Sequence, residues 1–386
     1  MTQVKQWLLL DPMDTLFFRG SDPMVSGENH DARTIFPPMP STLLGAIRTA
    51  ILEQRGIRPK DFVCDGGPDS EIRASFPFLG TPETPGFDVC GPIFHSELSD
   101  QGSDWFIPAP SYWFAKLPLD SDEDSDSQSE VLRKGREASD DLTTQGALND
   151  GTRIDVTVAR TSPKEIGELG LCGSVKDPSW LMEPIQGDPK SLAGCWTTLK
   201  SFDELRHKNS GCLVLRGCIG PMTAGEPALV RLSTLAASEH RVGIAIGADT
   251  RKVRSGYLYA TTHVRLRQGF KLAIGLSQEL IPTYLDPKGI LKLGGEQRTA
   301  GYELVSQDPS FTKVQSDWIM SLNPSPTSLL EKKGWEGNPR VSGAIIRMAG
   351  WDMKERFHKR VTAYFPAGTV VNVDPHEEAP FGFIRI

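Results

Sequence analysis

WLLLDPMDTLFFRG, residues 7–20, is the stretch around which the rest of the sequence is organised. Its two apolar runs predict a strand that is kinked at Asp11-Pro12. A polar loop follows over 21–33, and the prolines of IFPPMP at 35–40 keep the chain extended because they disfavour helix. Ser41 then predicts a helix N-cap, since apolar residues recur at helical spacing immediately after it. The expected unit is a strand, a basic loop, a proline-rich segment and a capped helix.

The remaining chain alternates short strand patterns with possible helices. Residues 154–158 alternate as a half-buried strand does, and 242–246 with 257–259 predict a β-hairpin around a turn at 247–250. Helical patterns occupy 277–285 and 325–333. Because the expected strands are connected by hairpins and not by long crossover connections, the sequence predicts an α+β protein.

The length of 386 residues suits two domains, which we expect at 1–225 and 226–386. Between 120 and 150 the apolar content falls and Ser, Asp and Glu dominate. Such a segment buries too little apolar surface to offset its ordering entropy, so we expect a disordered acidic insertion. Its deletion is expected to leave the melting temperature nearly unchanged.

The formal net charge is −7, which by itself argues against a nucleic-acid binder. Residues 120–130 hold six acids and no base, so the rest of the chain has a net charge of −1 and leaves room for a basic face. Six cysteines without a Cys-x-x-Cys pair indicate free thiols in a reducing compartment. No apolar run is long enough for a membrane span, and the expectation is a cytoplasmic protein without membrane contact.

Two blocks near the start, DPMDTLFFR at 11–19 and FPPMPSTLLGAIRT at 36–49, resemble the opening of a RAMP protein of CRISPR systems. The resemblance is specific to the subunit of the type III-B Cmr complex that holds the repeat-derived 5′ end of the guide RNA. Further blocks that agree are HRVGIAI at 240–246, LGGE at 293–296, GWD at 350–352 and PFGF at 380–383. The resemblance implies two ferredoxin-like (RRM-like) domains packed together.

The expected hairpin carries basic residues interleaved with aromatic ones. Arg251 and Arg254 stand near its turn, followed by Tyr257 and Tyr259. Guanidinium groups neutralise phosphates and aromatic rings offer stacking surfaces to bases, so this mixture suits RNA. The alternative is a solvated hairpin with ordinary surface charge. A second basic cluster lies at 354–360. Its alternative is a charged helix face without a ligand.

The segment LGGEQR, 293–298, places Gly294 and Gly295 beside Arg298. Glycines let a backbone approach a phosphate closely, although a turn without a ligand is the commoner explanation of such a pattern. The segment contains Glu296 but lacks the paired aspartates that a polymerase-type site needs to hold two metal ions. The sequence also contains no Walker A or G-x-G-x-x-G pattern. We therefore expect neither a polymerase-type metal site nor a bound cofactor.

The seven histidines show no spacing typical of metal ligands. Some related RAMP proteins cleave guide precursors without metal, using a histidine as general acid or base. His30, in the first loop, is the candidate for that role, and its alternative is a solvated side chain.

The start of the first helix is a candidate anion site. A helix that begins at Ser41 and Thr42 has unpaired N–H groups and the positive end of its dipole there. Arg19, Arg33 and Arg48 are expected to bring positive charge to the same place. The alternative is that Ser41 only caps the helix and the arginines pair with local acids.

These observations and the resemblance together predict a non-catalytic RNA-binding subunit of a type III-B effector complex. The implied partners are the 5′ tag of the guide RNA (crRNA), the large polymerase-like subunit, the stacked backbone subunits and, indirectly, target RNA. The alternatives are a metal-independent endoribonuclease that processes guide precursors and a scaffold that touches no RNA. The candidate RNA-binding residues are Arg19, His30, Arg33, Ser41, Thr42, Arg48, Arg251, Arg254, Gly294, Gly295 and Arg298.

Overall fold

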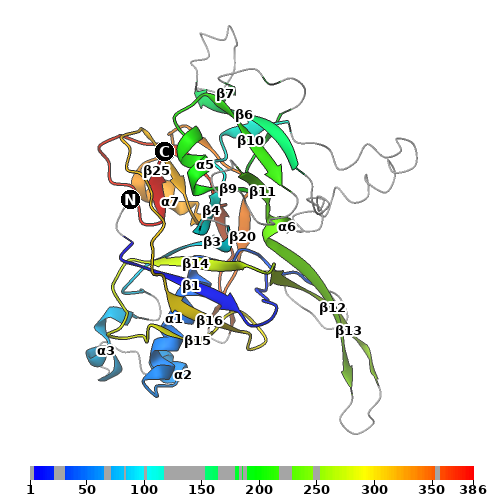
Figure 1. Cartoon of the computed structure of the whole chain (residues 1–386). Coiled ribbons are helices and arrows are strands. Elements are labelled where there is room, and N and C mark those ends of the chain that lie inside the picture. The colour runs from blue at the N-terminus through cyan, green and yellow to red at the C-terminus, as the bar shows by residue number, and fades with distance from the viewer. Residues whose placement is uncertain are drawn as a thin grey trace.

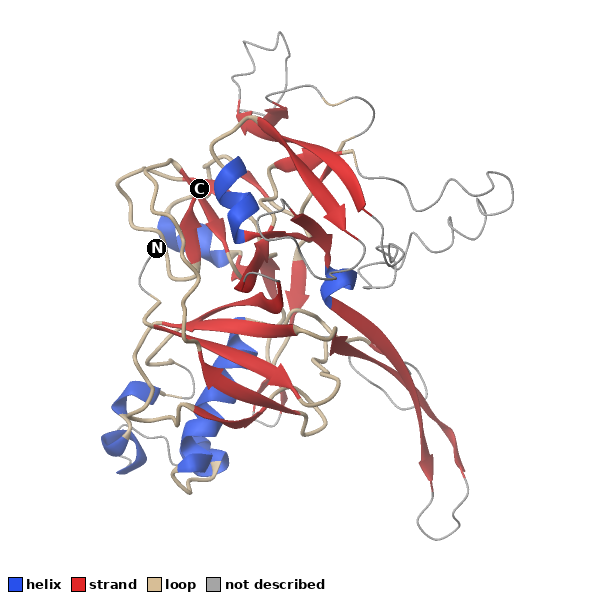
Figure 2. Cartoon of the chain, in the orientation of Figure 1, coloured by secondary structure: helices blue, strands red, loops and turns tan. Residues whose placement is uncertain are grey.

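The computed structural model of the chain gives a β-rich molecule (Figures 1 and 2). It describes residues 4–20, 31–64, 71–81, 84–99, 102–116, 153–163, 179–181, 185, 189–216, 228–246, 253–352 and 357–386. The acidic insertion at 120–150, the boundary at 225/226, His30 and Arg251 lie outside the described residues.

One large sheet runs through the molecule. Its strands, in spatial order, are β15 (Lys288–Lys292), β16 (Thr299–Leu304), β1 (Gln6–Pro12), β14 (Phe270–Leu276), β3 (Val89–Ser99), β4 (Gly102–Pro108), β9 (Cys195–Thr198), β11 (Ala228–Arg231), β10 (Ser210–Arg216), β6 (Arg153–Pro163), β5 (Trp113–Ala115) and β8 (Lys190–Ser191), with β7 (Ser179–Leu181) beside β6. β1 lies between β14 and β16 and pairs antiparallel with both. Strands from both sides of residue 225 therefore share one sheet, which is not divided at that point of the sequence.

β1 is buried on both faces. Leu8 and Leu10 pack into the same apolar cluster as α1 (Pro40–Gln54), and Trp7 and Leu9 belong to the cluster on the opposite face. A strand covered on both faces needs apolar side chains at every position, because successive residues point to opposite sides. This explains the uninterrupted WLLL run.

The helices are few and mostly short, so the expectation of an α+β protein is confirmed with strands in the majority (Figure 2). Besides α1 they are α2 (Pro59–Cys64), α3 (Glu71–Ser75), the 3-10 turn η1 (Pro77–Leu79), α5 (Leu199–Leu205), α6 (Leu232–Leu235) and α7 (Ser328–Lys333). None of the helices in the described ranges is long and apolar enough to cross a membrane.

Two helix predictions are corrected. α1 begins at Pro40 with Met39 as its N-cap, so Ser41 is not the cap. Proline suits the first helical position because it needs no N–H partner there and its φ angle is already helical.

The helix expected at 277–285 is absent and turns replace it. There the Gln6 side chain accepts the backbone N–H groups of Leu280 and Ile281 at 2.8 and 3.0 Å.

The expected hairpin is confirmed and is longer than the pattern indicated. β12 (Ala236–Ile246) pairs antiparallel with β13 (Val253–Leu266), and β2 (Asp31–Ala32) adds a short parallel pairing to β13. In Figure 1 the green β12–β13 ribbon projects away from the body. We call the end of this hairpin that joins the body its root.

The C-terminal segment forms smaller sheets against the body. One contains β19 (Arg340–Val341), β24 (Val370–Asn372), β17 (Trp318–Ser321) and β25 (Phe383–Arg385); a second contains β18 (Ser325–Pro326), β23 (Thr362–Phe365) and β20 (Ile346–Met348); β21 (Trp351–Asp352) pairs with β22 (Phe357–His358). Met320, Val370 and Ile384 share an apolar cluster with Trp7 and Leu9. The sheet that contains β17, β24 and β25 therefore packs on the face of β1 opposite α1.

Candidate nucleic-acid interface

The first loop begins and ends in a short backbone ladder that carries two arginines. Arg19 forms an isolated antiparallel bridge with Thr34, and the Ile35 N–H donates to the Phe18 carbonyl at 2.8 Å. Both Arg19 and Arg33 are exposed. The ladder thus places two exposed arginines at neighbouring backbone positions at the surface, with Arg33 one position from Thr34, the partner of Arg19.

This ladder is attached to the hairpin root. Leu16 bridges to Val264 of β13, and the Thr34 hydroxyl donates to the Thr262 carbonyl at 2.5 Å. Ala32 of β2 pairs with Thr261 in the next register position. Arg19 and Arg33 therefore lie beside the point where β12–β13 leaves the body.

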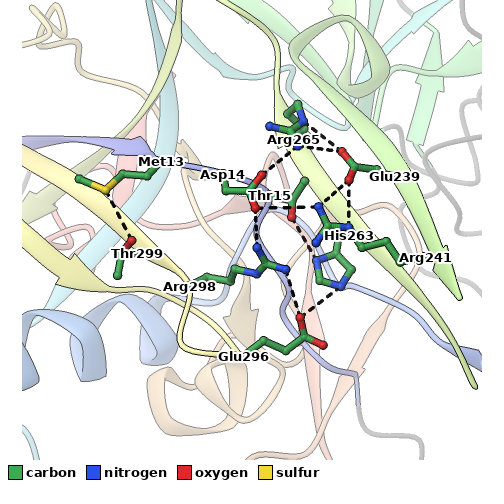
Figure 3. A network of polar contacts seen from close by, with 10 residues as sticks. All are labelled: Met13, Asp14, Thr15, Glu239, Arg241, His263, Arg265, Glu296, Arg298 and Thr299. Carbon is green, nitrogen blue, oxygen red and sulfur yellow. Dashed lines mark hydrogen bonds and ion pairs between the residues drawn. The ribbon is translucent and has the colours of Figure 1, made fainter. Parts of the chain in front are cut away.

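A network of charged side chains braces the same root (Figure 3). Asp14, just after β1, accepts hydrogen bonds from Arg298 at 2.5 Å and from Arg265 of β13 at 2.9 Å. Glu239 of β12 accepts from Arg265 at 3.0 Å and from Arg241 at 2.5 and 2.9 Å. Three elements that are distant in sequence are joined here.

The electrostatics of this root network keep its carboxylates ionised. A backbone hydrogen bond from Thr15, reinforced by Arg265 and Arg298, lowers the pKa of Asp14. Hydrogen bonds from Arg241 and then Arg265 lower the pKa of Glu239. Because each arginine is matched to a carboxylate, the network adds rigidity to the root and little net charge.

His263 completes the network from inside. It is fully buried, its ring stacks on Phe17 with centroids 5.0 Å apart, and its Nδ1 lies 3.2 Å from the Thr15 hydroxyl. Its Nε2 lies 3.6 Å from a carboxylate oxygen of Glu296. Burial lowers the pKa of His263, so we assign it a neutral ring that packs the root.

The glycine-containing loop at 293–298 has a structural role in the fold. The φ angle of Gly294 is +87°, and a Cβ placed there would lie 2.6 Å from the carbonyl oxygen of Phe17. The Gly295 N–H donates to the same oxygen at 2.7 Å. These glycines let the loop pack closely against the backbone of Phe17. This packing positions Arg298, whose side chain is 17% exposed, beside Asp14.

Arg48, which was expected to bring positive charge to the start of α1, lies elsewhere on the helix. The Arg48 guanidinium donates to the Thr81 carbonyl at 2.5 Å and lies 4.8 Å from the ring centroid of Phe62. It therefore ties α1 to α2 and to the loop after η1, about 12 Å along the helix from Pro40. Ser41 is exposed, and the N–H of Thr42 donates to the Met39 carbonyl at 2.9 Å.

The structure brings some of the expected residues together and separates others. Arg19, Arg33 and Arg298 gather around the hairpin root, whereas Arg48 lies toward α2. Arg254 is in β13, and of it only the backbone is described. Sequence reasoning missed Asp14, Glu239 and His263, because their partners are up to 284 residues away and leave no local pattern.

Two further observations concern β12 and the possibility of a metal site. Val242 and Ile244 are 71% and 46% exposed on one face of β12. In the part of the chain that the structure describes, no group of three or more His, Cys, Asp or Glu is arranged to hold a metal ion.

Fold and site together define a class of molecule: a β-rich α+β protein with two exposed arginines beside the braced root of a long projecting hairpin. The family comparison is more specific. The family model described as CRISPR-associated protein (Cas_Cmr3) matches residues 8–325. The chain therefore belongs to this family, as the sequence blocks indicated.

The chain is also similar to solved structures at low identity. A chain of the type III-B Cmr-beta complex bound to cognate target RNA and AMPPnP is 15% identical, with a TM-score of 0.48 over 95% of this chain and 86% of that chain. A chain of the Csm3-Csm4 subcomplex of the type III-A CRISPR-Cas interference complex is 13% identical, with a TM-score of 0.35 over 96% of this chain and 92% of that chain. A search of curated proteins returned no match.

Proposed function

We propose that this protein is a non-catalytic RNA-binding subunit of a type III-B Cmr effector complex. In that complex it captures the repeat-derived 5′ end of the guide RNA and joins the large polymerase-like subunit to the stacked backbone subunits. The family match over residues 8–325 carries the proposal. Similar chains come from Cmr-beta structures described as bound to cognate target RNA.

The geometry of the root supports RNA as the ligand. Exposed guanidinium groups neutralise phosphates, and phosphate contacts supply most of the affinity for single-stranded RNA. The backbone ladder fixes the main chain at Arg19 and Arg33, so only their side chains have to be ordered when a phosphate binds.

The root network narrows the set of residues that we assign to RNA. Arg241, Arg265 and Arg298 already bind carboxylates at 2.5 to 3.0 Å. Drawing them to a phosphate requires breaking those ion pairs and leaves the carboxylates beside the RNA. We assign the orientation of the hairpin to this network. Arg19 and Arg33, which are exposed beside the root, are our candidates for the phosphate contacts.

We also propose that one half of the sheet is ferredoxin-like. The order β16–β1–β14–β3 is antiparallel throughout, and α1 connects β1 to β3 while β14 lies between them. This is the split βαβ arrangement of that fold. It draws strands from the beginning of the chain and from 270–304. The other half departs from the pattern, because β10 and β11 are parallel neighbours.

A salt series tests the RNA assignment. Each phosphate contact to a single strand contributes about 0.7 to the slope of log affinity against log salt, so the Arg19→Ala/Arg33→Ala double variant is expected to lower that slope by roughly 1.4. The measurement is filter binding of a guide-like RNA. Arg58→Ala is the matched control, because Arg58 is an exposed arginine near α2 that pairs with Asp61 at 2.8 Å. Equal slopes in all three proteins would contradict the assignment.

Incubation with a repeat-containing precursor RNA in the absence of metal tests the lack of catalysis. We expect no cleavage by the wild-type protein or by His30→Ala. Cleavage that His30→Ala abolishes would instead establish the endoribonuclease alternative. Purification from the host tests the complex, since small RNAs with a common 5′ sequence are expected to accompany the protein together with other subunits.

A further inference from the structure

The large sheet ends at β15, which has a strand neighbour on one side only. It pairs antiparallel with β16, with Ile290 opposite Gly301. In the described part of the chain no strand lies on its other side, and Figure 1 shows β15 beyond β16 as seen from β1. A strand at the end of a sheet presents backbone N–H and C=O groups with which another strand can pair. We call this side of β15 its open edge.

The register shows which backbone groups point to the open edge. Immediately beyond the last pair of the strand, the Leu293 N–H donates to the Arg298 carbonyl at 2.8 Å. Hydrogen-bonded and non-hydrogen-bonded pairs alternate between antiparallel neighbours, so positions 289 and 291 also bond to β16. The N–H and C=O groups of Lys288, Ile290 and Lys292 therefore point outward, where they have no hydrogen-bond partner among the described residues.

The side chains at these three positions lie on one face of the sheet and are open to solvent. Those of Lys288 and Lys292 are 81% and 55% exposed, and Ile290 is 59% exposed. Leu291 points to the opposite face and is buried in the same apolar cluster as α1. The open edge thus presents one apolar side chain between two positive ones.

The ion pairs of the two lysines are weak. The Lys288 ammonium lies 3.9 Å from a carboxylate oxygen of Glu303, and the Lys292 ammonium lies 2.6 Å from one of Glu53 on α1. Each of these carboxylates is more than a third exposed, so water screens both pairs. A carboxylate on a bound strand can therefore replace either of them.

The charges distinguish between possible occupants of the open edge. A second copy paired antiparallel about Ile290 would place Lys288 of one copy opposite Lys292 of the other, and like charges that are directly opposite destabilise a strand pair. Lysines protect edge strands against such self-association. A strand with carboxylates at the same two positions would instead form two attractive pairs.

We propose that the open edge of β15 binds an extended acidic segment of a partner protein by β-strand addition. The segment pairs antiparallel with β15 and carries an apolar side chain opposite Ile290. Two positions before and after that side chain it carries aspartate or glutamate, opposite Lys292 and Lys288. The inference rests on the part of the proposed function that joins neighbouring subunits, and it does not depend on RNA binding.

A synthetic peptide of nine residues tests the open edge, with valine at its centre, aspartate two positions to either side and threonine elsewhere. Fluorescence anisotropy with the full-length protein is expected to show saturable binding. Methylation of the valine backbone nitrogen, which points to β15, is expected to weaken binding about tenfold because a backbone hydrogen bond is lost. Methylation of the next threonine nitrogen, which points away from β15, is expected to change binding little.

Two variants test the protein side of the same interaction. Lys288→Glu/Lys292→Glu is expected to lose the aspartate peptide and to bind a peptide with lysine at those positions, an exchange that a structural effect alone does not produce. Ile290→Pro removes an N–H that points away from the sheet, where proline is tolerated, so it is expected to lose binding without a change in melting temperature. Ile290→Thr keeps the N–H and is the matched control, which is expected to bind the peptide more tightly than Ile290→Pro.

Absence of peptide binding would overturn the inference, and so would equal binding of the two methylated peptides, a comparison that needs no protein variant. A dimer in sedimentation that Ile290→Pro separates would assign the open edge to a second copy and would also overturn it. The proposed function is tested by different measurements, the RNA salt series and the purification of small RNAs and other subunits with the protein. Failure of the docking edge therefore leaves those results unchanged.

Discussion

At the scale of single residues, Asp14 is the carboxylate on which the root network depends. It contacts Arg298 from the loop after β15 and Arg265 from β13, so one side chain connects the end of β1 to two distant elements. The neighbouring Thr15 is fully buried and lies beside His263. A short stretch after the first strand therefore determines how the hairpin leaves the body.

We predict that Asp14→Asn lowers the melting temperature at pH 7 and that the difference from wild type shrinks in acid. The pKa of Asp14 is lowered in the folded state, so its stabilisation is present above the ordinary aspartate pKa of about 3.9 and is lost as the pH falls through the lowered value. Thermal unfolding at pH 7 and at about pH 3 measures this.

The control for this prediction is Glu331→Gln, an exposed carboxylate on α7 outside the network. It is expected to leave the melting temperature unchanged at both pH values. A difference between Asp14→Asn and wild type that stays constant down to pH 3 would mean that the ionised carboxylate is not the stabilising form.

At the scale of elements, α1 shows how local signals and packing divide their roles. Its buried face contains Leu43, Ile47 and Ile51, which have no exposed surface and pack against the sheet that contains β1. Its start is set by Pro40 with Met39 as the N-cap. The apolar stripe was therefore predicted correctly, whereas the capping residue was not.

We predict that Ser41→Ala changes the free energy of unfolding by less than about 0.5 kcal/mol, because Ser41 is exposed and makes no capping hydrogen bond. Ile47→Ala is expected to cost about 2 to 5 kcal/mol, since it leaves a cavity under the sheet. Urea titration of both variants measures the two values. A loss of about 1 kcal/mol in Ser41→Ala would instead be the cost of removing an N-cap.

At the scale of the whole molecule, the sheet joins the beginning of the chain to its second half. β1 needs β14 and β16 as neighbours, and its other face needs the C-terminal sheets. The two elements that flank the acidic insertion, β5 and β6, are antiparallel neighbours, with Ala115 opposite Val158. Both ends of the insertion thus leave from one region of the sheet.

We predict that replacing residues 120–150 with a short glycine-serine linker leaves the melting temperature nearly unchanged. The segment has no apolar face to bury, and Ala115 and the start of β6 are offset along the sheet by only about 17 Å, which a short linker spans. Calorimetry of the deletion variant measures the effect. A decrease of many degrees would show that the segment packs against the body.

Sequence by itself determined the features that depend on neighbouring residues. The WLLL run predicts a strand, the spacing from Leu43 onward predicts α1, and the family follows from blocks such as DPMDTLFFR. Local periodicity encodes such features because strand and helix place side chains at fixed intervals. The β12–β13 hairpin was predictable for the same reason, although its length was not.

Tertiary structure alone decided which distant residues meet. Arg298 reaches Asp14 across 284 positions, and Arg48 is directed to Thr81 instead of the start of α1. Each of these contacts depends on how strand pairing and helix packing place segments that are distant in the sequence. Because register is set by the sum of many pairings, no pattern around one arginine distinguishes a guanidinium that braces the fold from one that lies open at the surface.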